Sequence, residues 1–373
     1  MKIIVTGTRG IPDILGGVET HCEKLYPIIV DDGYNVTLVR RSCYVSDNNK
    51  ISDYKGIKIK DIYAPHSKSL EAIVHTFLAV CYAKKEKADV LHIHAIGPAI
   101  LTPFARLLGL KVVVTHHGAD YERQKWGKMA KFMLKTGERN AAKYANHIIS
   151  ISDIISQSLK DKYGRTTNVH LIFNGVDKAD RVQASDYLKS LGLEKQKYIF
   201  ALGRFVEEKG FDNLIKAYAK TKHRDDIKLV IAGDADHETE YSLKLKDLAK
   251  KENVVLPGFI KGDHLKELFS NAALFVLPSF HEGLPIALLE AMSYNLDVLI
   301  SNIPANTQVL SSEELLFDPN NIEEMASKID AKLSSVKEFV EYDLSAYNWF
   351  NIAAQTEKVY NDMTSSTNKK GVE

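Results

Sequence analysis

The residues best suited to chemistry lie in segment 279–292, which reads SFHEGLPIALLEAM. Glu282 lies in a loop after an expected buried strand, and Glu290 lies eight positions later on a helix. We expect Pro285 in the first turn of that helix, where its missing N–H is not needed. Ionised carboxylates are pure hydrogen-bond acceptors, so Glu282 and Glu290 can take separate hydroxyl-bearing parts of one ligand. The pattern predicts a polyol site.

The same segment predicts an anion site. Gly283 lets the backbone come close to a ligand, and the N–H groups of Gly283, Leu284 and Ile286 surround the positive end of the expected helix. Backbone N–H groups at a helix start suit phosphate. The structural alternative is a capped helix with two solvated glutamates.

A second candidate is segment 203–210, GRFVEEKG, which follows the expected strand 198–202. Arg204 can make bidentate contacts to phosphate oxygens, and Lys209 adds a compact positive charge. A solvated loop between a strand and a helix can hold the same residues. However, this segment occupies the same end of the expected sheet as Glu282, so we expect the two segments to lie together.

The first half of the chain offers glycine loops and histidines. Loops 6–10 and 15–18 open the first expected helix, but they lack the GxGxxG spacing of dinucleotide sites, so bound NAD is not expected. His117 follows the expected strand 112–115, and a histidine near neutrality can donate or accept a proton. A packed or helix-capping histidine is the alternative. His92 and His94 share one side of a strand, but no carboxylate is suitably spaced beside them, so we predict no metal and no cofactor.

Short apolar strands alternate with helical patterns along the chain, which indicates parallel sheets covered on both faces. Such sheets place ligands outside the carboxyl ends of their strands. The expected strands are 3–5, 36–39, 90–94, 112–115, 147–152, 198–202, 228–232, 254–256, 274–277 and 297–301. The clearest expected helices are 18–30, 211–218, 240–250, 265–271 and 285–293.

A chain of 373 residues is expected to form two domains. We predict a first domain over 1–180, a second over 181–345, a helix over about 346–363 that packs back on the first domain, and a frayed tail over 364–373.

The composition narrows the class of protein. A charged fraction of 26% is typical of globular proteins, and a net charge of +1 argues against a general nucleic-acid binder. The three cysteines lack metal or CxxC spacing, which favours a reducing compartment. The N-terminus enters a strand at once, and no apolar stretch reaches the ~18 residues of a membrane span, so we expect a cytoplasmic protein.

Together these motifs resemble the family 4 glycosyltransferases, retaining enzymes with the GT-B fold, over nearly the whole chain. The resemblance implies two Rossmann-like doubly wound domains that face each other across a cleft. It also implies that Arg204 and Lys209 hold the donor pyrophosphate, that Glu290 holds the ribose hydroxyls and that Glu282 holds the transferred sugar. The residues expected to complete the donor site are Gly258, Phe259 and Ile260 beside the base, with Gly283, Leu284, Pro285 and Ile286 at the helix start.

In the first domain, the resemblance places Gly16 and Gly17 against the donor phosphates. His117 is expected to line the sugar site or to support the departing phosphate, and Asp120 to orient the acceptor or His117. The catalytic residues implied are His117, Asp120, Arg204, Lys209 and Glu282. Enzymes of this family typically work without a metal.

Two stretches resemble a subgroup of bacterial surface-polysaccharide enzymes that includes rhamnosyltransferases. They are TGTRGIP with GGVET near the start, and THHGADYERQKWGK at 115–128. The resemblance favours dTDP-rhamnose as donor, or otherwise a UDP-sugar, and a glycan or lipid-linked acceptor. A nucleotide-sugar 2-epimerase of the same architecture and a non-catalytic sugar-nucleotide-binding homologue are the alternatives.

Helix 123–143 concerns the acceptor side. Between 121 and 147 there are seven Lys or Arg and two acids, while Trp126, Met129, Phe132 and Met133 recur at helical spacing as an apolar side. A basic amphipathic helix can rest on an anionic membrane surface, which would make the enzyme peripheral on the inner face of the plasma membrane. The alternative is a core-packed helix with a solvated basic face.

Overall fold

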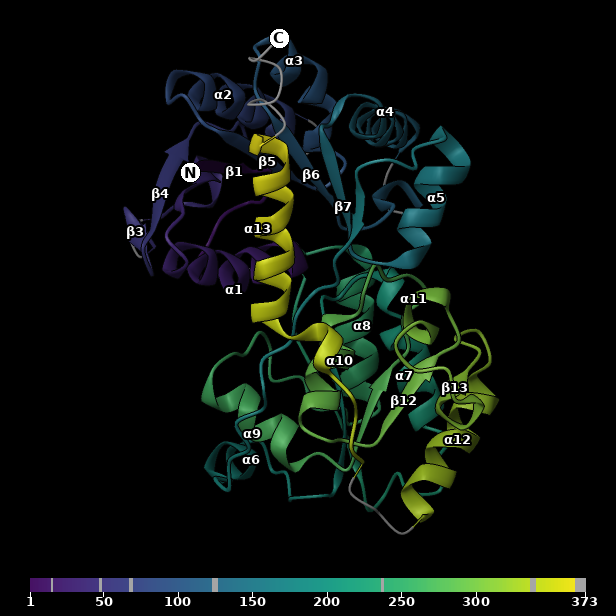
Figure 1. Ribbon diagram of the computed structural model, residues 1–373. Helices are drawn as coiled ribbons and strands as arrows, with labels where there is room; N and C mark the ends of the chain where they lie inside the picture. Colours follow the sequence, from purple (N-terminus) through teal and green to yellow (C-terminus); the bar gives the residue numbers. More distant parts are fainter. Residues whose placement is uncertain are drawn as a thin grey trace. The chain divides into compact units, whose positions relative to one another are not determined.

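The computed structural model describes residues 1–14, 16–46, 49–66, 70–122, 127–235, 238–335 and 340–365. Its internal contacts divide the chain into two units. The first domain comprises Met1–Gly175 and Ala346–Glu373, and the second comprises Val176–Ser345. The division falls a few residues before the boundary at 180 that the sequence suggested. Figure 1 shows the elements of both domains, coloured along the chain.

The described residues of the first domain form an eight-stranded sheet in the order β3-β4-β2-β1-β5-β6-β7-β8. Neighbouring strands are parallel except β3 and β4, which are antiparallel at one edge. The strands are β1 (Lys2–Thr6), β2 (Asn35–Arg41), β3 (Asp53–Tyr54), β4 (Ile57–Ile62), β5 (Val90–His94), β6 (Val112–His116), β7 (His147–Ser150) and β8 (Val169–Leu171).

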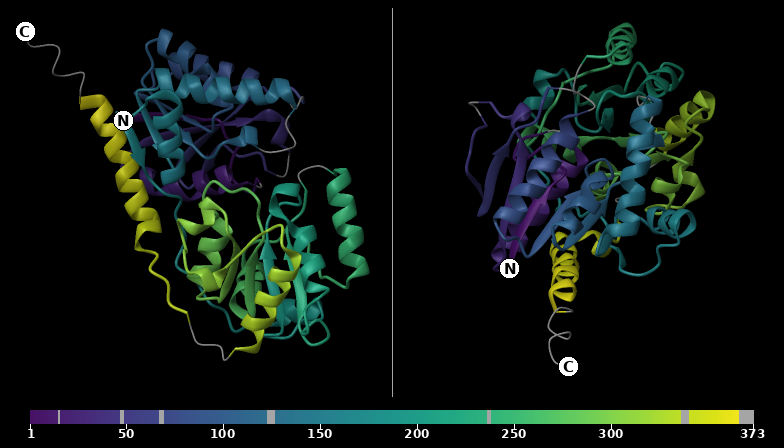
Figure 2. Two further views of the ribbon diagram at one scale, coloured as in Figure 1. Left: turned by 90° about the vertical axis from the view of Figure 1, so that its right-hand side faces the viewer. Right: turned by 90° about the horizontal axis from the view of Figure 1, so that it is seen from above.

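Helices lie on both faces of this sheet, with α1 on one face and α2 on the other (Figure 2). The last helix, α13, packs along α1 although the second domain separates them in sequence (Figure 1). Ile352 and Tyr360 of α13 join Leu25 and Ile29 of α1 in one buried cluster. The helices are α1 (Gly17–Asp31), α2 (Glu71–Lys85), α3 (Thr102–Leu107), α4 (Lys128–Tyr144), α5 (Asp153–Tyr163) and α13 (Trp349–Ser365).

The described residues of the second domain form a five-stranded parallel sheet in the order β10-β9-β11-β12-β13. The strands are β9 (Tyr198–Leu202), β10 (Lys228–Ala232), β11 (Leu274–Leu277), β12 (Val298–Ser301) and β13 (Leu316–Phe317). The helices are α6 (Asp186–Ser190), α7 (Phe211–Tyr218), α8 (Glu240–Lys251), α9 (Asp263–Asn271), α10 (Ile286–Ser293), α11 (Pro304–Thr307) and α12 (Ile322–Ser334). Both domains are therefore Rossmann-like α/β units, as the sequence predicted.

Several expected boundaries were wrong. Segment 254–256 forms only an isolated bridge between Val255 and Val230, and the proline at 257, which lacks an N–H, follows at once. The strand expected over 147–152 ends at Ser150, because the Ser152 hydroxyl caps α5 by accepting from the Ile155 N–H at 3.4 Å. The tail expected to fray from 364 is helical through Ser365, and 366–373 lie outside the described residues.

Candidate functional site

Two of the predicted residues meet at the carboxyl edge of the second sheet. Because β9 and β11 are neighbours, the loops that follow them lie side by side. Lys209, in the short 3-10 helix η4 (Glu207–Lys209), places its Nζ 2.6 Å from Oε1 of Glu282. The side chains are 19% and 11% exposed, so the pair still reaches solvent. The Ser279 hydroxyl donates to the same Glu282 oxygen at 2.7 Å.

Gly210 brings these two loops together. It has φ +65°, and an added Cβ would lie 2.4 Å from the Pro278 carbonyl oxygen. Only glycine adopts this conformation at low cost with a neighbour so close. The Phe280 N–H also donates to the Glu208 carbonyl at 2.8 Å. Arg204 lies partly exposed in the turn that leads from β9 into η4.

Behind Glu282 lies a buried polar chain that the sequence analysis missed. The Ser301 hydroxyl donates to the Ser279 carbonyl at 2.5 Å, and the Asn306 Nδ2 donates to the Ser301 hydroxyl at 2.9 Å. All three side chains are buried. Their only signal in the sequence is that Ser279 and Ser301 are small polar residues at the ends of two apolar strands. This chain fixes the loop that presents Glu282.

The helix after this loop begins one residue later than predicted. Pro285 is the N-cap of α10, with extended backbone angles, rather than a residue of its first turn. The N–H of an N-cap residue is not used in the intrahelical bonds, so proline fits there, and no side chain among the described residues caps the helix start. Gly283 and Ile286 are partly exposed, Leu284 and Pro285 are buried, and Glu290 lies partly exposed one turn further along α10. The first N–H groups of α10 therefore have no partner within the helix.

The segment expected to face a nucleotide base lies beyond β10. The Gly258 carbonyl accepts from the Gly233 N–H at 2.8 Å, and Gly258 has φ +78°. Phe259 is 50% exposed, while Ile260 is buried. Because β10 and β9 are neighbours, this segment shares the carboxyl edge with Arg204. The second domain thus gathers most of its predicted site residues at one edge of one sheet.

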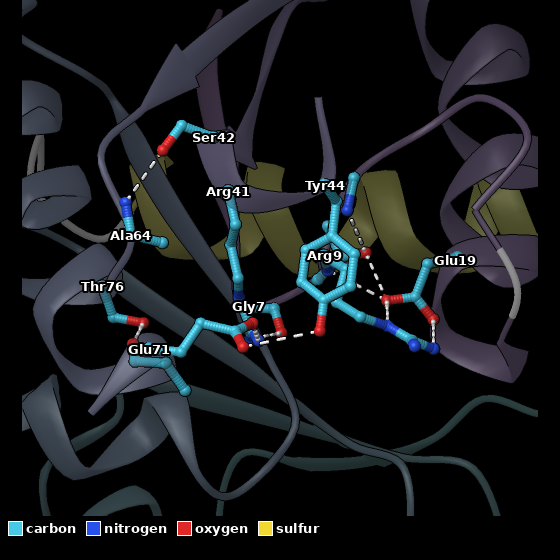
Figure 3. Close-up of polar contacts among 12 residues, drawn as sticks. Gly7, Arg9, Glu19, Arg41, Ser42, Tyr44, Ala64, Glu71 and Thr76 are labelled. Carbon is cyan, nitrogen blue, oxygen red and sulfur yellow. Dashed lines mark hydrogen bonds and ion pairs between the residues drawn. The ribbon is translucent and has the colours of Figure 1, made fainter. Parts of the chain in front are cut away.

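In the first domain, a buried ion pair shapes the glycine loop (Figure 3). Glu19 accepts from the Thr8 hydroxyl at 3.0 Å, from the Arg9 N–H at 2.9 Å and from the Arg9 guanidinium at 3.3 Å. Burial raises the pKa of Glu19, but Arg9 outweighs it and holds that pKa below its usual value. Gly16 has φ +152°, and an added Cβ would lie 2.1 Å from Oε2 of Glu19. Gly17, exposed, is the first residue of α1.

A second ion pair joins the loop after β1 to the start of α2. Arg41 donates to Glu71 at 2.7 Å and to the Gly7 carbonyl at 3.3 Å (Figure 3). The Tyr44 hydroxyl contacts the other Glu71 oxygen at 3.4 Å, and the Arg9 guanidinium lies 5.6 Å from the centre of the Tyr44 ring. These contacts hold the loops after β1 and β2 against each other. Arg41 and Glu71 were not predicted.

His117 lies in a cluster of histidines. Its Nε2 is 2.9 Å from Nδ1 of His94, the last residue of β5. The His21 ring, from α1, has its centroid 5.1 Å from that of His117, and its Nδ1 is 2.9 Å from the Asn174 amide oxygen. The Tyr26 hydroxyl lies 2.6 Å from Nε2 of His94. The sequence paired His92 with His94, but gave no signal for His21.

Burial makes the imidazoles of this cluster weak bases. It lowers the pKa of His21 to about 4 and that of His92 to about 3. Burial also lowers the pKa of both His94 and His117 well below the usual value. Near neutral pH, His117 is therefore an uncharged imidazole, which acts through a hydrogen bond rather than through positive charge. Asp120 begins the 3-10 helix η3 (Asp120–Glu122), and its N–H donates to the Gly118 carbonyl at 3.0 Å. Its role stays a prediction.

Helix α4 corresponds to the predicted basic helix, and its buried side consists mainly of small residues. Its buried residues are Gly137, Glu138, Ala141 and Ala142, whereas Met129 and Phe132 are 71% and 67% exposed. Met129 and Phe132 therefore do not form the packed side that the alternative of a core-packed helix implied, and the membrane contact stays a prediction. Residues 123–126 of the predicted helix, including Trp126, lie outside the described residues.

Two families of known proteins match consecutive parts of the chain. Glycosyltransferase Family 4 matches residues 15–180, and Glycosyl transferases group 1 matches residues 183–346. Together they span almost the whole chain. The two matches together identify the chain as a glycosyltransferase. No helix among the described residues of this glycosyltransferase is both long and apolar enough to cross a membrane.

Three relatives are similar in sequence. An uncharacterised glycosyltransferase of Methanocaldococcus jannaschii is 26% identical, over 96% of this chain and 98% of its own. The UDP-Gal:α-D-GlcNAc-diphosphoundecaprenol α-1,3-galactosyltransferase of Escherichia coli is 26% identical, over 96% of each chain. An O-antigen chain mannosyltransferase of Salmonella typhimurium is 28% identical over 53% of each chain. The rhamnosyltransferase resemblance gains no support from these names.

Solved structures share the fold. Sucrose-phosphate synthase of Thermosynechococcus elongatus has a TM-score of 0.78 at 18% identity, covering 98% of this chain and 99% of its own. Anabaena HepE in complex with UDP-glucose has a TM-score of 0.75 at 18% identity, covering 99% and 100%. These likenesses bear out the predicted GT-B architecture of two Rossmann-like domains.

Proposed function

We propose that this glycosyltransferase moves a sugar from a nucleoside diphosphate to a hydroxyl of a glycan or lipid-linked acceptor, with retention and without a metal. The observation that carries the proposal is the contact between Lys209 and Glu282 beside Arg204 and the uncapped start of α10. Two cations and a helix N-terminus suit a diphosphate, and the carboxylate beside them suits sugar hydroxyls.

The leaving diphosphate is where negative charge grows during the reaction. Arg204, Lys209 and the N–H groups of α10 stabilise that charge. The bond between the anomeric carbon and the phosphate oxygen breaks, and the acceptor oxygen bonds to that carbon from the leaving-group face. The acceptor proton passes to the donor phosphate. Glu282 holds sugar hydroxyls and Glu290 holds ribose hydroxyls.

The first domain contributes neutral hydrogen-bonding groups. His117 is uncharged near neutral pH, so it donates or accepts a single hydrogen bond at the sugar or the phosphate. The His94 contact at 2.9 Å constrains which ring nitrogen of His117 carries the proton. Gly16 and Gly17 approach the donor phosphates with backbone alone, and Asp120 orients the acceptor or His117.

The sequence resemblance and the names of the relatives favour different donor sugars. The sequence resemblance favours dTDP-rhamnose, while the names of the relatives favour galactose and mannose. The galactosyltransferase name specifies a UDP donor, and HepE is described in complex with UDP-glucose. We therefore propose a donor with a uracil or thymine base, with Phe259 and Gly258 beside it.

The acceptor is proposed to be lipid-linked and presented at an anionic membrane. Helix α4 exposes Met129 and Phe132 on its outer side together with Lys128, Lys135 and Arg139. Apolar side chains among cations suit the boundary between lipid headgroups and acyl chains. The galactosyltransferase relative is named for a diphosphoundecaprenol acceptor. We propose on this basis that the enzyme is cytoplasmic and peripheral on the inner face of the plasma membrane.

The test is turnover across dTDP-rhamnose, UDP-galactose, UDP-glucose and GDP-mannose, with chelator present, measured as acceptor product and as slow donor hydrolysis. Lys209→Met and Glu282→Gln are expected to lower turnover at least ~100-fold, which is the usual cost of losing one such electrostatic contact. Lys216→Met is the matched control, because Lys216 pairs with Asp212 on the surface of α7.

Product analysis with donor alone separates the alternatives. Formation of an epimeric nucleotide sugar without acceptor would indicate a 2-epimerase. Binding of the donor without any turnover would indicate a non-catalytic homologue. Unchanged turnover in both Lys209→Met and Glu282→Gln would overturn the site assignment.

A further inference from the structure

Three imidazoles converge in the first domain in a way that transfer itself does not require. His21, His94 and His117 each offer one ring nitrogen, and these three atoms lie within 4.8 Å of one another. They come from separate elements: α1, the end of β5 and the residue after β6. His92 is not part of the group, because its Nε2 contacts the Thr115 hydroxyl at 2.6 Å and its Nδ1 contacts the Tyr360 hydroxyl at 2.6 Å.

The surroundings of these imidazoles match those of metal-bound histidines. A ligating histidine generally gives its other ring nitrogen to an oxygen, which fixes the ring. The Asn174 oxygen holds Nδ1 of His21 at 2.9 Å, and the Tyr26 hydroxyl holds Nε2 of His94 at 2.6 Å. These contacts leave Nε2 of His21 and Nδ1 of His94 for a metal ion.

The spacing requires only small movements. Zn²⁺ binds imidazole nitrogen at about 2.0–2.1 Å, so tetrahedral ligands lie roughly 3.4 Å apart. The His94 and His117 nitrogens, now 2.9 Å apart, would separate slightly as the ion replaces their hydrogen bond. The remaining separations, at most 4.8 Å, would close by no more than about 1.4 Å. Ring rotations supply shifts of this size.

We propose that His21, His94 and His117 form a binding site for one borderline transition-metal cation, best Zn²⁺, with a fourth position left for water or an anion. Three nitrogen ligands suit Zn²⁺ and Co²⁺, whereas Mg²⁺ and Ca²⁺ require oxygen ligands. The ion takes the His117 nitrogen that His94 contacts and turns the ring. Occupancy therefore inhibits transfer. The inhibition rests on the proposed function of His117, whereas the binding site does not.

Binding is tested on the full chain without an affinity tag, after treatment with chelator and its removal. Titration with Co²⁺ is expected to give visible bands of tetrahedral intensity that saturate at one equivalent, without a thiolate charge-transfer band. One equivalent of Zn²⁺ is expected to abolish those bands, and Mg²⁺ is not. His21→Gln and His94→Gln are expected to lose the bands.

The matched control is His170→Gln. His170 and His147 also form a contact between two imidazoles at 2.9 Å in the first domain, so this variant removes a histidine pair without touching the three-histidine site. It is expected to keep the Co²⁺ bands. Tyr26→Phe keeps all three ligands but removes the oxygen behind His94, and it is expected to weaken Zn²⁺ binding about 10- to 100-fold. Fluorescence of the buried Trp349, which packs on His21, checks that each variant is folded.

Three results decide the proposal. Absence of tetrahedral Co²⁺ bands in the folded wild-type chain overturns it, as does their persistence in folded His21→Gln. Inhibition of transfer by one equivalent of Zn²⁺, reversed by chelator and lost in the residual activity of His21→Gln, supports it in full. Binding without inhibition supports the site and contradicts the role of His117 in transfer, so the two claims fail separately.

Discussion

Replacing His75 should change the acid stability of the first domain in a direction that can be calculated. His75 is fully buried in α2, and among the described residues neither ring nitrogen has a partner at hydrogen-bonding geometry. Burial, helped by the charge of Arg41, lowers the pKa of His75 to about 4. An apolar residue of similar size, as in His75→Leu, removes this buried polar group and its titration.

The sign follows from the two protonation equilibria. Below pH ~6.5 the unfolded chain binds a proton at His75, whereas the folded chain does not until pH falls to about 4. Stability is therefore lost as pH falls through this window, by about 1.4 kcal/mol per pH unit. Between pH 7 and pH 5 the loss from His75 is about 2 kcal/mol, after allowance for partial protonation at each end. His75→Leu should not show this loss.

Urea unfolding followed by tryptophan fluorescence measures this effect in the right domain. Both tryptophans of the chain, at 126 and 349, belong to the first domain. We expect His75→Leu to gain about 2 kcal/mol on the wild type between pH 7 and pH 5. The control is His66→Leu, which replaces an exposed histidine of the same domain and should shift stability equally at both pH values. An equal pH dependence for His75→Leu and the wild type would refute the reasoning.

Three further predictions concern the loops and the outer helix. Gly210→Ala should destabilise the second domain by more than ~1 kcal/mol in thermal unfolding followed by circular dichroism, because its Cβ would meet the Pro278 carbonyl at 2.4 Å; an unchanged transition would contradict this. Ser279→Ala should lower turnover roughly fivefold, the worth of one hydrogen bond of about 1 kcal/mol to Glu282, and equal turnover would show that Ser279 does not position that carboxylate. Flotation with vesicles of one-third anionic lipid should carry the wild type but not the double variant Met129→Ser, Phe132→Ser, and vesicles of zwitterionic lipid should carry neither. Equal flotation of wild type and variant would remove α4 as the membrane contact.

Sequence patterns correctly predicted the strands that are buried along nearly their whole length. Strands β5, β9, β10 and β11 are short and almost entirely buried, and their predicted and observed bounds coincide. Strand β4 was missed because Lys58 and Lys60 alternate with buried isoleucines near the sheet edge, so it lacks a continuous apolar run.

Contacts between distant elements could not be predicted in this way. Gly137 lets α4 lie so close to the segment after β5 that an added Cβ would be 1.9 Å from the Ile96 carbonyl oxygen. The face of α4 that carries small residues is therefore the face that is buried. Counting large apolar residues therefore does not identify the side that α4 buries. His21 was missed because its approach to His94 and His117 depends on how α1 packs against the strand ends. In contrast, Lys209 and Glu282 were predicted to lie together because both lie in loops that follow strands at the same end of one expected sheet. The structure shows the two side chains in contact.

The central claim is that the carboxyl edge of the second sheet holds the donor diphosphate. Calorimetric titration of UDP and dTDP into the wild type, Lys209→Met and Lys216→Met tests it most directly. We expect Lys209→Met to weaken binding at least ~10-fold, by about 1.4 kcal/mol or more, since a charge-assisted contact to phosphate is lost. We expect Lys216→Met to bind as the wild type does. Equal affinity of the wild type and Lys209→Met for both nucleotides would contradict the account.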